Sequence, residues 1–362
     1  MPVIWCAISG HGYGHAAQTV PVLNELGRRI PSLTVVLGTT VPDSFFESRL
    51  TIPWKRMSLD QGGGCVQQGP LSINIPATWS AYQKFHDNWE ERVTREMVVM
   101  RSCTPDLILS NISYLALEAG SKARIPSIAL ASLTWDEVLE LYVERENLEH
   151  RATINRIRES YQFASHVIRM LPSLGMDVFG EVTDVGPIGQ PPLAPSVTLR
   201  EKIQWKPQVP VVLVALGGVP VDALPVEAMQ TMTNYQFLVD SPVSEGSGHI
   251  CSLAEIPARF DEIFAVADCV ITKPGYATII EAVVYQKPVV YVRRFDFADE
   301  DGLVKYLHRY GRGYEMGRKD FVAGDWQLAL DGVSQLPHPA VDVPISGVEQ
   351  AADILAGYLG AS

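Results

Sequence analysis

Short runs of β-branched and other apolar residues alternate with longer amphipathic runs along this chain, and the alternation occurs twice. In the first half, the strand-like runs are residues 3–8, 34–37, 107–110 and 127–131, and the helical patterns are 18–29, 81–101 and 135–161. Apolar strands that are separated by helices form parallel sheets with both faces covered. The alternation therefore predicts an α/β fold.

A proline-rich stretch without periodicity separates the two halves. Beyond it, the expected strands are 209–216, 237–239, 269–272 and 289–292, and the expected helices are 255–266, 277–285, 302–310 and 348–359. We therefore expect a first domain at 1–187, a linker at 188–207, a second domain at 208–345 and a C-terminal helix within 346–362, with packing back on the first domain as one arrangement. Doubly wound sheets bind ligands outside the carboxyl ends of their strands, so two such domains facing each other would form one cleft.

Composition argues against several function classes. The formal net charge of −12, without a basic stripe, argues against a nucleic-acid partner. The five cysteines form no C-x-x-C pair, which argues against a disulfide framework. The apolar runs are too short for a membrane span, and the N-terminus lacks a signal-peptide pattern, so we expect a cytoplasmic protein, with peripheral attachment to a membrane left open.

The stretch "SGHGYGHAAQ" (residues 9–18) follows the first expected strand. Its glycines do not match G-x-G-x-x-G, no acidic residue follows at the dinucleotide-site distance, and G-K-[S/T] is missing. His11 and His15 are four residues apart, as two metal ligands could be, but no third ligand is evident. Two interpretations remain: a loop histidine that caps the following helix, or an imidazole open to the cleft that acts as a general base.

A second constellation lies in residues 267–294. A strand ends at Thr272, a Pro274-Gly275 turn follows, and a helix is expected from about Tyr276, whose free N–H groups would favour an anion such as a diphosphate. One turn into this helix, Glu281 is either a hydrogen-bond acceptor for a ribose diol or a solvated helix residue.

Charged residues also follow the next expected strand. Arg293 and Arg294 are either a phosphate clamp or a surface pair. Asp299 and Glu300 either bind sugar hydroxyls or complement the N-terminus of the next helix, and we expect no metal site there.

The stretch 60–90 is long, glycine-rich and irregular, so we expect it to form a loop on the side of the cleft that a second substrate would occupy. Its Trp79 and Tyr82 are expected to anchor the stretch rather than to stack on a sugar.

Six stretches, in the same order along the chain, resemble a glycosyltransferase-like family: "SGHGYGH", "LTWDEV", "VALGGVP", "ADCVITKPGYATIIEA", "VRRFDFADEDGLVKYL" and "GYEMGRKDFVAGDW". This family includes the N-terminal domain of plant L-arabinokinases. More distantly, the chain resembles GT-B glycosyltransferases such as the N-acetylglucosaminyltransferase that forms lipid II. The resemblance implies a GT-B fold with two Rossmann-like domains whose parallel sheets face each other across a cleft, and it implies no sugar kinase activity, because the kinase half of the arabinokinases has no counterpart here.

The resemblance also assigns site residues. His15 would be the catalytic base or a contact to the donor phosphate, and His11 is a motif residue without an assigned role. The expected donor-side residues are Gly12, Gly14, Gly217, Gly218, Pro274, Gly275, Tyr276, Ala277, Thr278, Glu281, Arg293, Arg294, Asp299 and Glu300. Two positions depart from the family pattern: Gln18 stands where the family has arginine, and Asn111 stands where an aspartate is expected.

We therefore expect an inverting, metal-independent transfer of a hexosyl or N-acetylhexosaminyl group from a nucleotide-sugar, a UDP-sugar above all, to a hydroxyl of a small molecule, glycan or lipid. No cofactor is expected besides the donor, and the protein would be a monomer or a homodimer. Two alternatives stay open, namely a nucleotide-sugar hydrolase or epimerase of the same fold and a non-catalytic nucleotide-sugar sensor.

Overall fold

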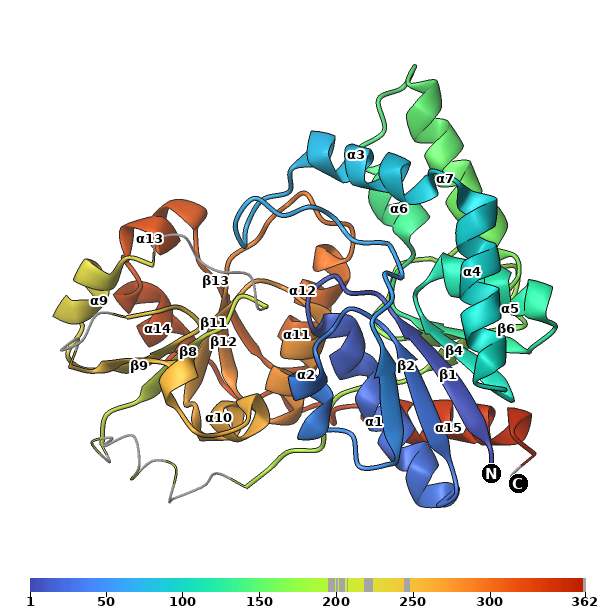
Figure 1. The fold of residues 1–362 in the computed structure, drawn as a ribbon. Coiled ribbons are helices and arrows are strands. Elements are labelled where there is room, and N and C mark those ends of the chain that lie inside the picture. Colours follow the sequence, from blue (N-terminus) through green and yellow to red (C-terminus); the bar gives the residue numbers. More distant parts are fainter. Residues whose placement is uncertain are drawn as a thin grey trace.

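A computed structural model describes the chain except residues 195–198, 200, 202–205, 207, 218–223, 244–247 and 361–362. Two parallel β-sheets, each with helices packed against it, lie side by side (Figure 1). Most of the strand residues are fully buried, so the apolar runs in the sequence supply the two sheet cores. The expected α/β fold with two parallel sheets is confirmed.

The first sheet has seven strands in the order β3-β2-β1-β4-β5-β6-β7, and every pairing is parallel. Its strands are β1 (Val3–Ile8), β2 (Thr34–Gly38), β3 (Trp54–Met57), β4 (Leu107–Asn111), β5 (Ser127–Ala131), β6 (His166–Met170) and β7 (Thr183–Val185). The strand order reverses between β1 and β4, where Ile8 lies opposite Asn111. Ligands of open α/β sheets bind at such a reversal, because the connections diverge there and leave a crevice.

The second sheet repeats this plan with the order β10-β9-β8-β11-β12-β13. Its strands are β8 (Val211–Val214), β9 (Gln236–Val239), β10 (Ile250–Ser252), β11 (Cys269–Thr272), β12 (Pro288–Tyr291) and β13 (Arg312–Glu315). Here the order reverses between β8 and β11. The expected helix at its carboxyl edge is present as α11, which begins at Tyr276.

Helices cover the faces of both sheets. The first half contributes α1 (Gly14–Arg29), α2 (Asp43–Glu47), α3 (Ile75–His86), α4 (Trp89–Ser102), α5 (Tyr114–Ala123), α6 (Trp135–Glu140) and α7 (Leu148–Tyr161). The second half contributes α9 (Val226–Thr231), α10 (Phe260–Val266), α11 (Tyr276–Val284), α12 (Glu300–Tyr310), α13 (Arg318–Ala323) and α14 (Gln327–Ser334). The final helix, α15 (Gly347–Tyr358), returns to the first sheet and packs against α1 and β7 (Figure 1).

Two long helices expected from periodicity are each interrupted. The 81–101 pattern is divided between α3 and α4 at Asn88, whose φ of 54° is left-handed and breaks the helical path. The 135–161 pattern is divided between α6 and α7, and Asn147 caps the second piece by accepting from the amides of Glu149 and His150. Asparagine tolerates the left-handed region and competes for backbone donors, so it ends and restarts helices inside an unbroken periodicity.

The expected irregular stretch 60–90 instead contains α3. Trp79 on this helix stacks on His150 with ring centroids 3.8 Å apart, and its indole N–H donates to the carbonyl of Tyr142 at 3.3 Å. Tyr82 is also buried. Both aromatic residues therefore anchor the stretch, as predicted.

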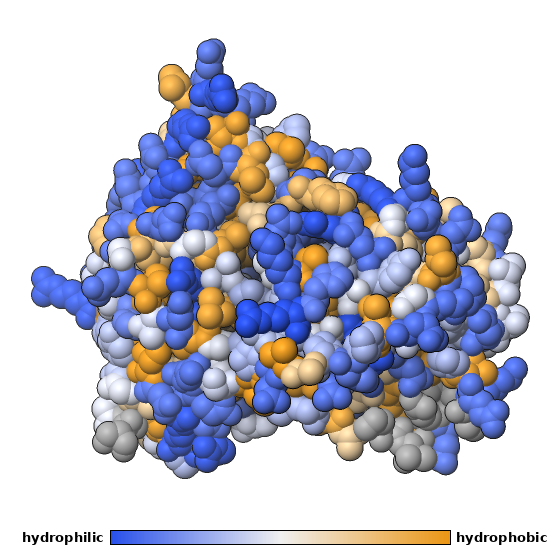
Figure 2. Space-filling model, turned by 180° about the vertical axis from the view of Figure 1, so that it is seen from behind, coloured by the Kyte–Doolittle hydropathy of each residue, from blue (hydrophilic) through white to orange (hydrophobic). Residues whose placement is uncertain are grey.

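The surface seen from behind is mainly hydrophilic, with hydrophobic residues scattered in small groups (Figure 2). A search of the described helices finds none with the length and apolar character needed to cross a membrane.

Candidate functional site

A cavity of about 540 Å³ lies between the two domains, at the carboxyl edges of both sheets. The two glycine loops meet at its wall, since a side chain built on Gly12 would lie 3.6 Å from the carbonyl oxygen of Gly217. Both glycines have a left-handed φ, which favours glycine at these positions. Of the expected site residues, His11, Gly12, Gly14, His15, Gly217, Gly275, Tyr276, Ala277, Thr278, Glu281, Arg294 and Asp299 line this cavity.

His15 lies in the first turn of α1, with its ring on the cavity wall. Its Nδ1 is 2.8 Å from Oδ1 of Asn111, which ends the neighbouring strand β4, and its ring meets Trp135 edge-on at 5.5 Å. Burial lowers the pKa of His15, and the hydrogen bond to Asn111 opposes that change only in part. The imidazole is therefore neutral at pH 7, which is the form a general base requires.

His11 lies in the loop that precedes α1. The glycine-rich segment passes directly over it, because a side chain on Gly64 would meet the His11 ring at 2.5 Å. Burial lowers the pKa of His11 to about 3, and electrostatic interaction with His15, Lys273 and Arg294 acts in the same direction. Both histidines are thus uncharged, and within the described ranges no group of three or more His, Cys, Asp and Glu side chains is arranged to hold a metal ion.

The donor side is built on the start of α11. The N–H groups in its first turn have no partner within the helix, and Ala277, Thr278 and Glu281 line the cavity beside them. Burial raises the pKa of Glu281 to about 7, while Arg49 from the opposite domain lowers it. The carboxyl of Glu281 therefore ionises near neutrality, at the position expected for a ribose contact.

Tyr276 takes a structural part in this wall. Its hydroxyl donates to the carbonyl of Leu171 at 3.0 Å and accepts from the amide of Ile188 at 3.1 Å. Since this hydroxyl is engaged on both sides, Tyr276 fixes the first turn of α11 against the first domain.

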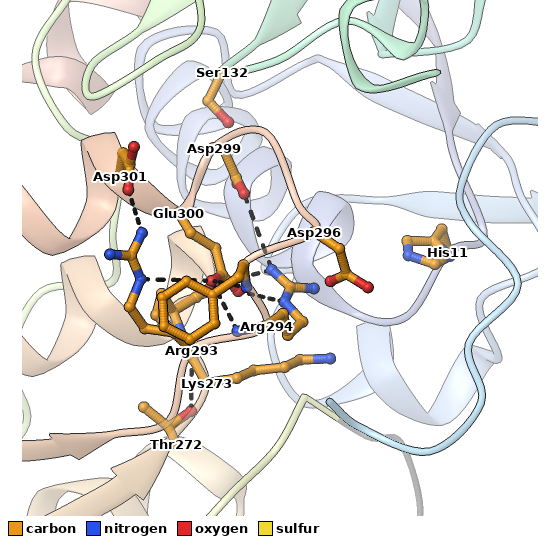
Figure 3. A network of polar contacts seen from close by, with 12 residues as sticks. His11, Ser132, Thr272, Lys273, Arg293, Arg294, Asp296, Asp299, Glu300 and Asp301 are labelled. Carbon is orange, nitrogen blue, oxygen red and sulfur yellow. Dashed lines mark hydrogen bonds and ion pairs between the residues drawn. The ribbon is translucent and has the colours of Figure 1, made fainter. Parts of the chain in front are cut away.

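Arg294 and Asp299 face the cavity, whereas Glu300 does not. The buried Glu300 carboxylate forms an ion pair with Arg294 and accepts from the amides of Arg294 and Phe295 (Figure 3). The expected sugar contact of Glu300 is therefore replaced by a structural role, because its oxygens are occupied in shaping the 293–300 loop. Asp299 keeps Oδ1 without a hydrogen-bond partner, and burial raises its pKa to about 6.

Arg293 also differs from expectation. It pairs with the exposed Asp301, lies over the ring of Phe295 at 4.9 Å, and is not part of the cavity wall. Consecutive residues of an extended segment point in opposite directions, so only Arg294 of the pair turns inward. Pro274 is likewise outside the wall and offers its carbonyl to Arg294 at 3.1 Å, and Gly218 lies outside the described residues.

Lys273 is a cavity residue that the sequence analysis missed. Its side chain extends past Arg294 toward the side of His11 (Figure 3), and Nζ donates to Oε1 of Gln67 at 3.2 Å. Burial, followed by the charge of Arg294, lowers the pKa of Lys273 to about 7. The sequence did contain a signal for this residue, because a cationic side chain directly follows an apolar strand at the point where the strand order of the sheet reverses.

Three further residues that the sequence analysis did not assign to the site also line this wall. Gln67 and Arg49 come from loops of the first domain, and Trp135 begins α6. Trp135 lies within one of the stretches that carry the family resemblance.

No protein-family model matches the chain. The L-arabinokinase of Arabidopsis thaliana is 29% identical over 96% of the chain, and the chain spans 33% of that protein's length. Among solved structures, the calicheamicin glycosyltransferase CalG4 matches with a TM-score of 0.61 at 14% identity, covering 99% of this chain and 98% of that one. Arabidopsis thaliana UGT89C1 complexed with UDP matches with a TM-score of 0.61 at 15% identity, covering 99% of both chains. Acinetobacter baumannii MurG matches with a TM-score of 0.51 at 13% identity, covering 99% of this chain and all of the other.

The chain has the GT-B fold. In this GT-B structure, residues that follow β1 and β5 line the cavity together with residues that follow β8 and β11. The two walls of the cavity therefore differ: the first domain contributes the neutral His15, and the second contributes the start of α11 and Lys273.

Proposed function

We propose that the protein transfers a sugar from a nucleotide-sugar to an acceptor hydroxyl. The observation that carries the proposal is the pairing, in one cavity, of an anion-favouring wall with a neutral His15 on the opposite wall. The structural neighbour crystallised with UDP supports a uridine nucleotide as the first donor to test.

The donor would lie along α11. The free N–H groups at its start and the ammonium of Lys273 would hold the diphosphate, because both place positive charge at the same wall. Glu281 would accept hydrogen bonds from the ribose diol. Oδ1 of Asp299, which has no hydrogen-bond partner and lies 4.0 Å from the Arg294 guanidinium, would accept one from the sugar.

His15 would act as the general base. It would take the proton from the acceptor hydroxyl while the oxygen attacks the anomeric carbon and the bond from that carbon to the diphosphate breaks. Attack from the face opposite the leaving group inverts the anomeric centre. The leaving diphosphate would be stabilised by the α11 N-terminus and Lys273, so this reaction needs no metal ion.

The test begins with a panel of UDP-glucose, UDP-galactose and UDP-N-acetylglucosamine, each incubated with fractionated cell extracts, and measures released UDP together with glycosylated product. We expect His15→Gln to lower turnover by about two to four orders of magnitude while UDP-sugar binding persists. Glu281→Ala should weaken binding. His166→Gln, outside the cavity, is the matched control and should change neither.

The outcomes separate this proposal from its alternatives. Free sugar released without an acceptor identifies a hydrolase, and a changed sugar identifies an epimerase. Binding without any product, together with a cellular function that His15→Ala leaves intact, identifies a sensor. The proposal would be refuted if no glycosylated product formed and if Glu281→Ala left UDP-sugar binding unchanged.

A further inference from the structure

A chain of polar side chains runs from the His15 ring into the first domain. Nδ1 of His15 is 2.8 Å from Oδ1 of Asn111, and Nδ2 of Asn111 donates to Oε1 of Gln18 at 3.1 Å. Nε2 of Gln18 donates to the hydroxyl of Ser132 at 3.4 Å. All four side chains are buried, and none of them carries a charge.

Three neighbouring strands bring this chain together. His15 and Gln18 lie on α1 after β1, Asn111 ends β4, and Ser132 follows β5. Since these strands are adjacent and parallel, their carboxyl ends meet at one edge of the sheet. The chain of hydrogen bonds is therefore part of the site and not a surface contact.

The direction of this chain decides which nitrogen of His15 carries the proton. An amide has one accepting end and one donating end, so Asn111 can present its oxygen to His15 only if its NH₂ group has an acceptor elsewhere. Gln18 Oε1 is that acceptor. With Oδ1 facing the ring, Nδ1 must carry the hydrogen, and the lone pair is left on Nε2 for the cavity. The reversed amide would place the hydrogen on Nε2 and remove the base.

We propose that Gln18 is a positioning residue that fixes the orientation of the Asn111 amide and thereby holds His15 in the Nδ1–H tautomer. The catalytic consequence of this inference rests on the proposed function, but the tautomer itself does not.

Burial keeps His15 neutral, and the chain of hydrogen bonds adds no charge beside it. The titratable groups near His15 are His11 on the loop that precedes α1 and, across the cavity, Lys273 and Arg294, which act on His11. Among the described residues no carboxylate contributes to the pKa shift of His15, and the facing ring of Trp135 is uncharged. The imidazole is therefore oriented by amides alone, without the charge that would favour its protonated form.

The test reads the tautomer directly in the resting protein. Long-range ¹H–¹⁵N spectra of histidine-labelled protein distinguish the two ring nitrogens, and comparison with His15→Gln assigns the His15 signals among the eight histidines. We expect the Nδ1–H form in the wild type.

Two substitutions at Gln18 form a matched pair. Gln18→Glu keeps an acceptor for Asn111 and can accept from the Ser132 hydroxyl, so it should retain the Nδ1–H form. Gln18→Leu removes the acceptor and frees the amide to turn, so it should give a mixture of tautomers or the Nε2–H form. In turnover of a UDP-sugar, Gln18→Leu should lower kcat about five- to tenfold, the worth of one lost hydrogen bond, with little change in the donor KM.

Asn111→Asp supplies a second perturbation. A carboxylate can only accept, so the Nδ1–H tautomer should persist, and the added charge should raise the pKa of His15 and move the acid limb of the pH profile upward. Gln18→Met replaces Gln18→Leu if the latter does not fold.

The inference is overturned if the wild type shows the Nε2–H form, or if Gln18→Leu and Gln18→Met keep a pure Nδ1–H signal and an unchanged kcat. Because the spectra need no substrate, a failed glycosyl-transfer assay leaves this result standing. Equally, the Nε2–H tautomer in the wild type would refute the inference even if sugar transfer is observed.

Discussion

Replacement of Lys273 tests the donor side most directly. Lys273 is buried in the cavity wall, where its ammonium pairs with the neutral Gln67 amide and its pKa is lowered to about 7. A bound diphosphate adds negative charge beside Nζ and should raise this pKa toward the ordinary lysine value. Donor binding should then take up a proton wherever the free lysine is neutral.

The direction and the size of the pH effect on donor affinity follow from the lowered pKa of Lys273. Below about pH 7, Lys273 is already charged and its contribution to affinity is complete. Above pH 7, the lysine must first be protonated, so this contribution should fall about tenfold per pH unit, or ~1.4 kcal/mol, up to the pKa of the bound state. Glu281 ionises near the same pH and acts in the opposite direction, because its carboxylate form accepts from the ribose. A control that leaves Glu281 untouched is therefore needed.

Lys273→Arg is that control, since arginine stays charged throughout this range. The ratio of the UDP-glucose dissociation constants of wild type and Lys273→Arg should rise about tenfold per pH unit above pH 7 and stay constant below it. Lys273→Met should lose about 1.5–3 kcal/mol of binding at pH 7, the worth of a charge-assisted hydrogen bond.

Isothermal titration calorimetry in buffers of different ionisation enthalpy measures both affinity and proton uptake. UDP-glucose suits the assay because both of its phosphates are esterified and do not titrate here. At about pH 8, the wild type should take up about one proton more than Lys273→Arg. A ratio that is constant across the pH range, or wild-type binding by Lys273→Met, would refute the placement of the diphosphate at Lys273.

Three further predictions concern other parts of the site and its support. Glu281→Gln should weaken UDP-glucose binding about 10- to 100-fold above pH 7.5 but much less at pH 6, where the wild-type carboxyl is already protonated; calorimetry at both pH values checks this, and an equal loss at both contradicts it. Glu300→Gln should lower the free energy of unfolding in urea by about 3–5 kcal/mol because it removes the nearest counter-charge of the buried Arg294, whereas Asp301→Asn, at the exposed partner of Arg293, should change it by less than about 0.5 kcal/mol. Trp79→Ala should cost about 3–5 kcal/mol by emptying the space over His150, and thermal melts should separate it from the surface control Val98→Ala, which should melt like the wild type.

Two of the central strands were predicted residue by residue. The expected strands at 127–131 and 269–272 coincide with β5 and β11, because every residue in them is apolar or small and buried on both faces. The edge strands β3 and β13 have no continuous run of apolar or small residues that would predict them. The segments of β3 and β13 are largely polar, and they become strands because β2 and β12 offer their backbone donors and acceptors.

The positions of His15 and of the start of α11 could likewise be predicted from local sequence patterns. A strand, a glycine turn and a helix start place His15 and α11 at sheet edges whatever the rest of the chain does. The sequence alone thus determined which side chains stand at the two edges.

The tertiary structure decided which of these side chains share a space and which point away. Lys273 and Gln67 are 206 residues apart, and their contact exists only because the two domains face each other. Arg293 and Arg294 are adjacent and chemically identical, and both form an ion pair with Glu300. Only Arg294 lines the cavity, whereas Arg293 also pairs with the exposed Asp301. Local pattern sets which backbone conformation a segment adopts, but burial and charge pairing depend on atoms brought in from distant segments.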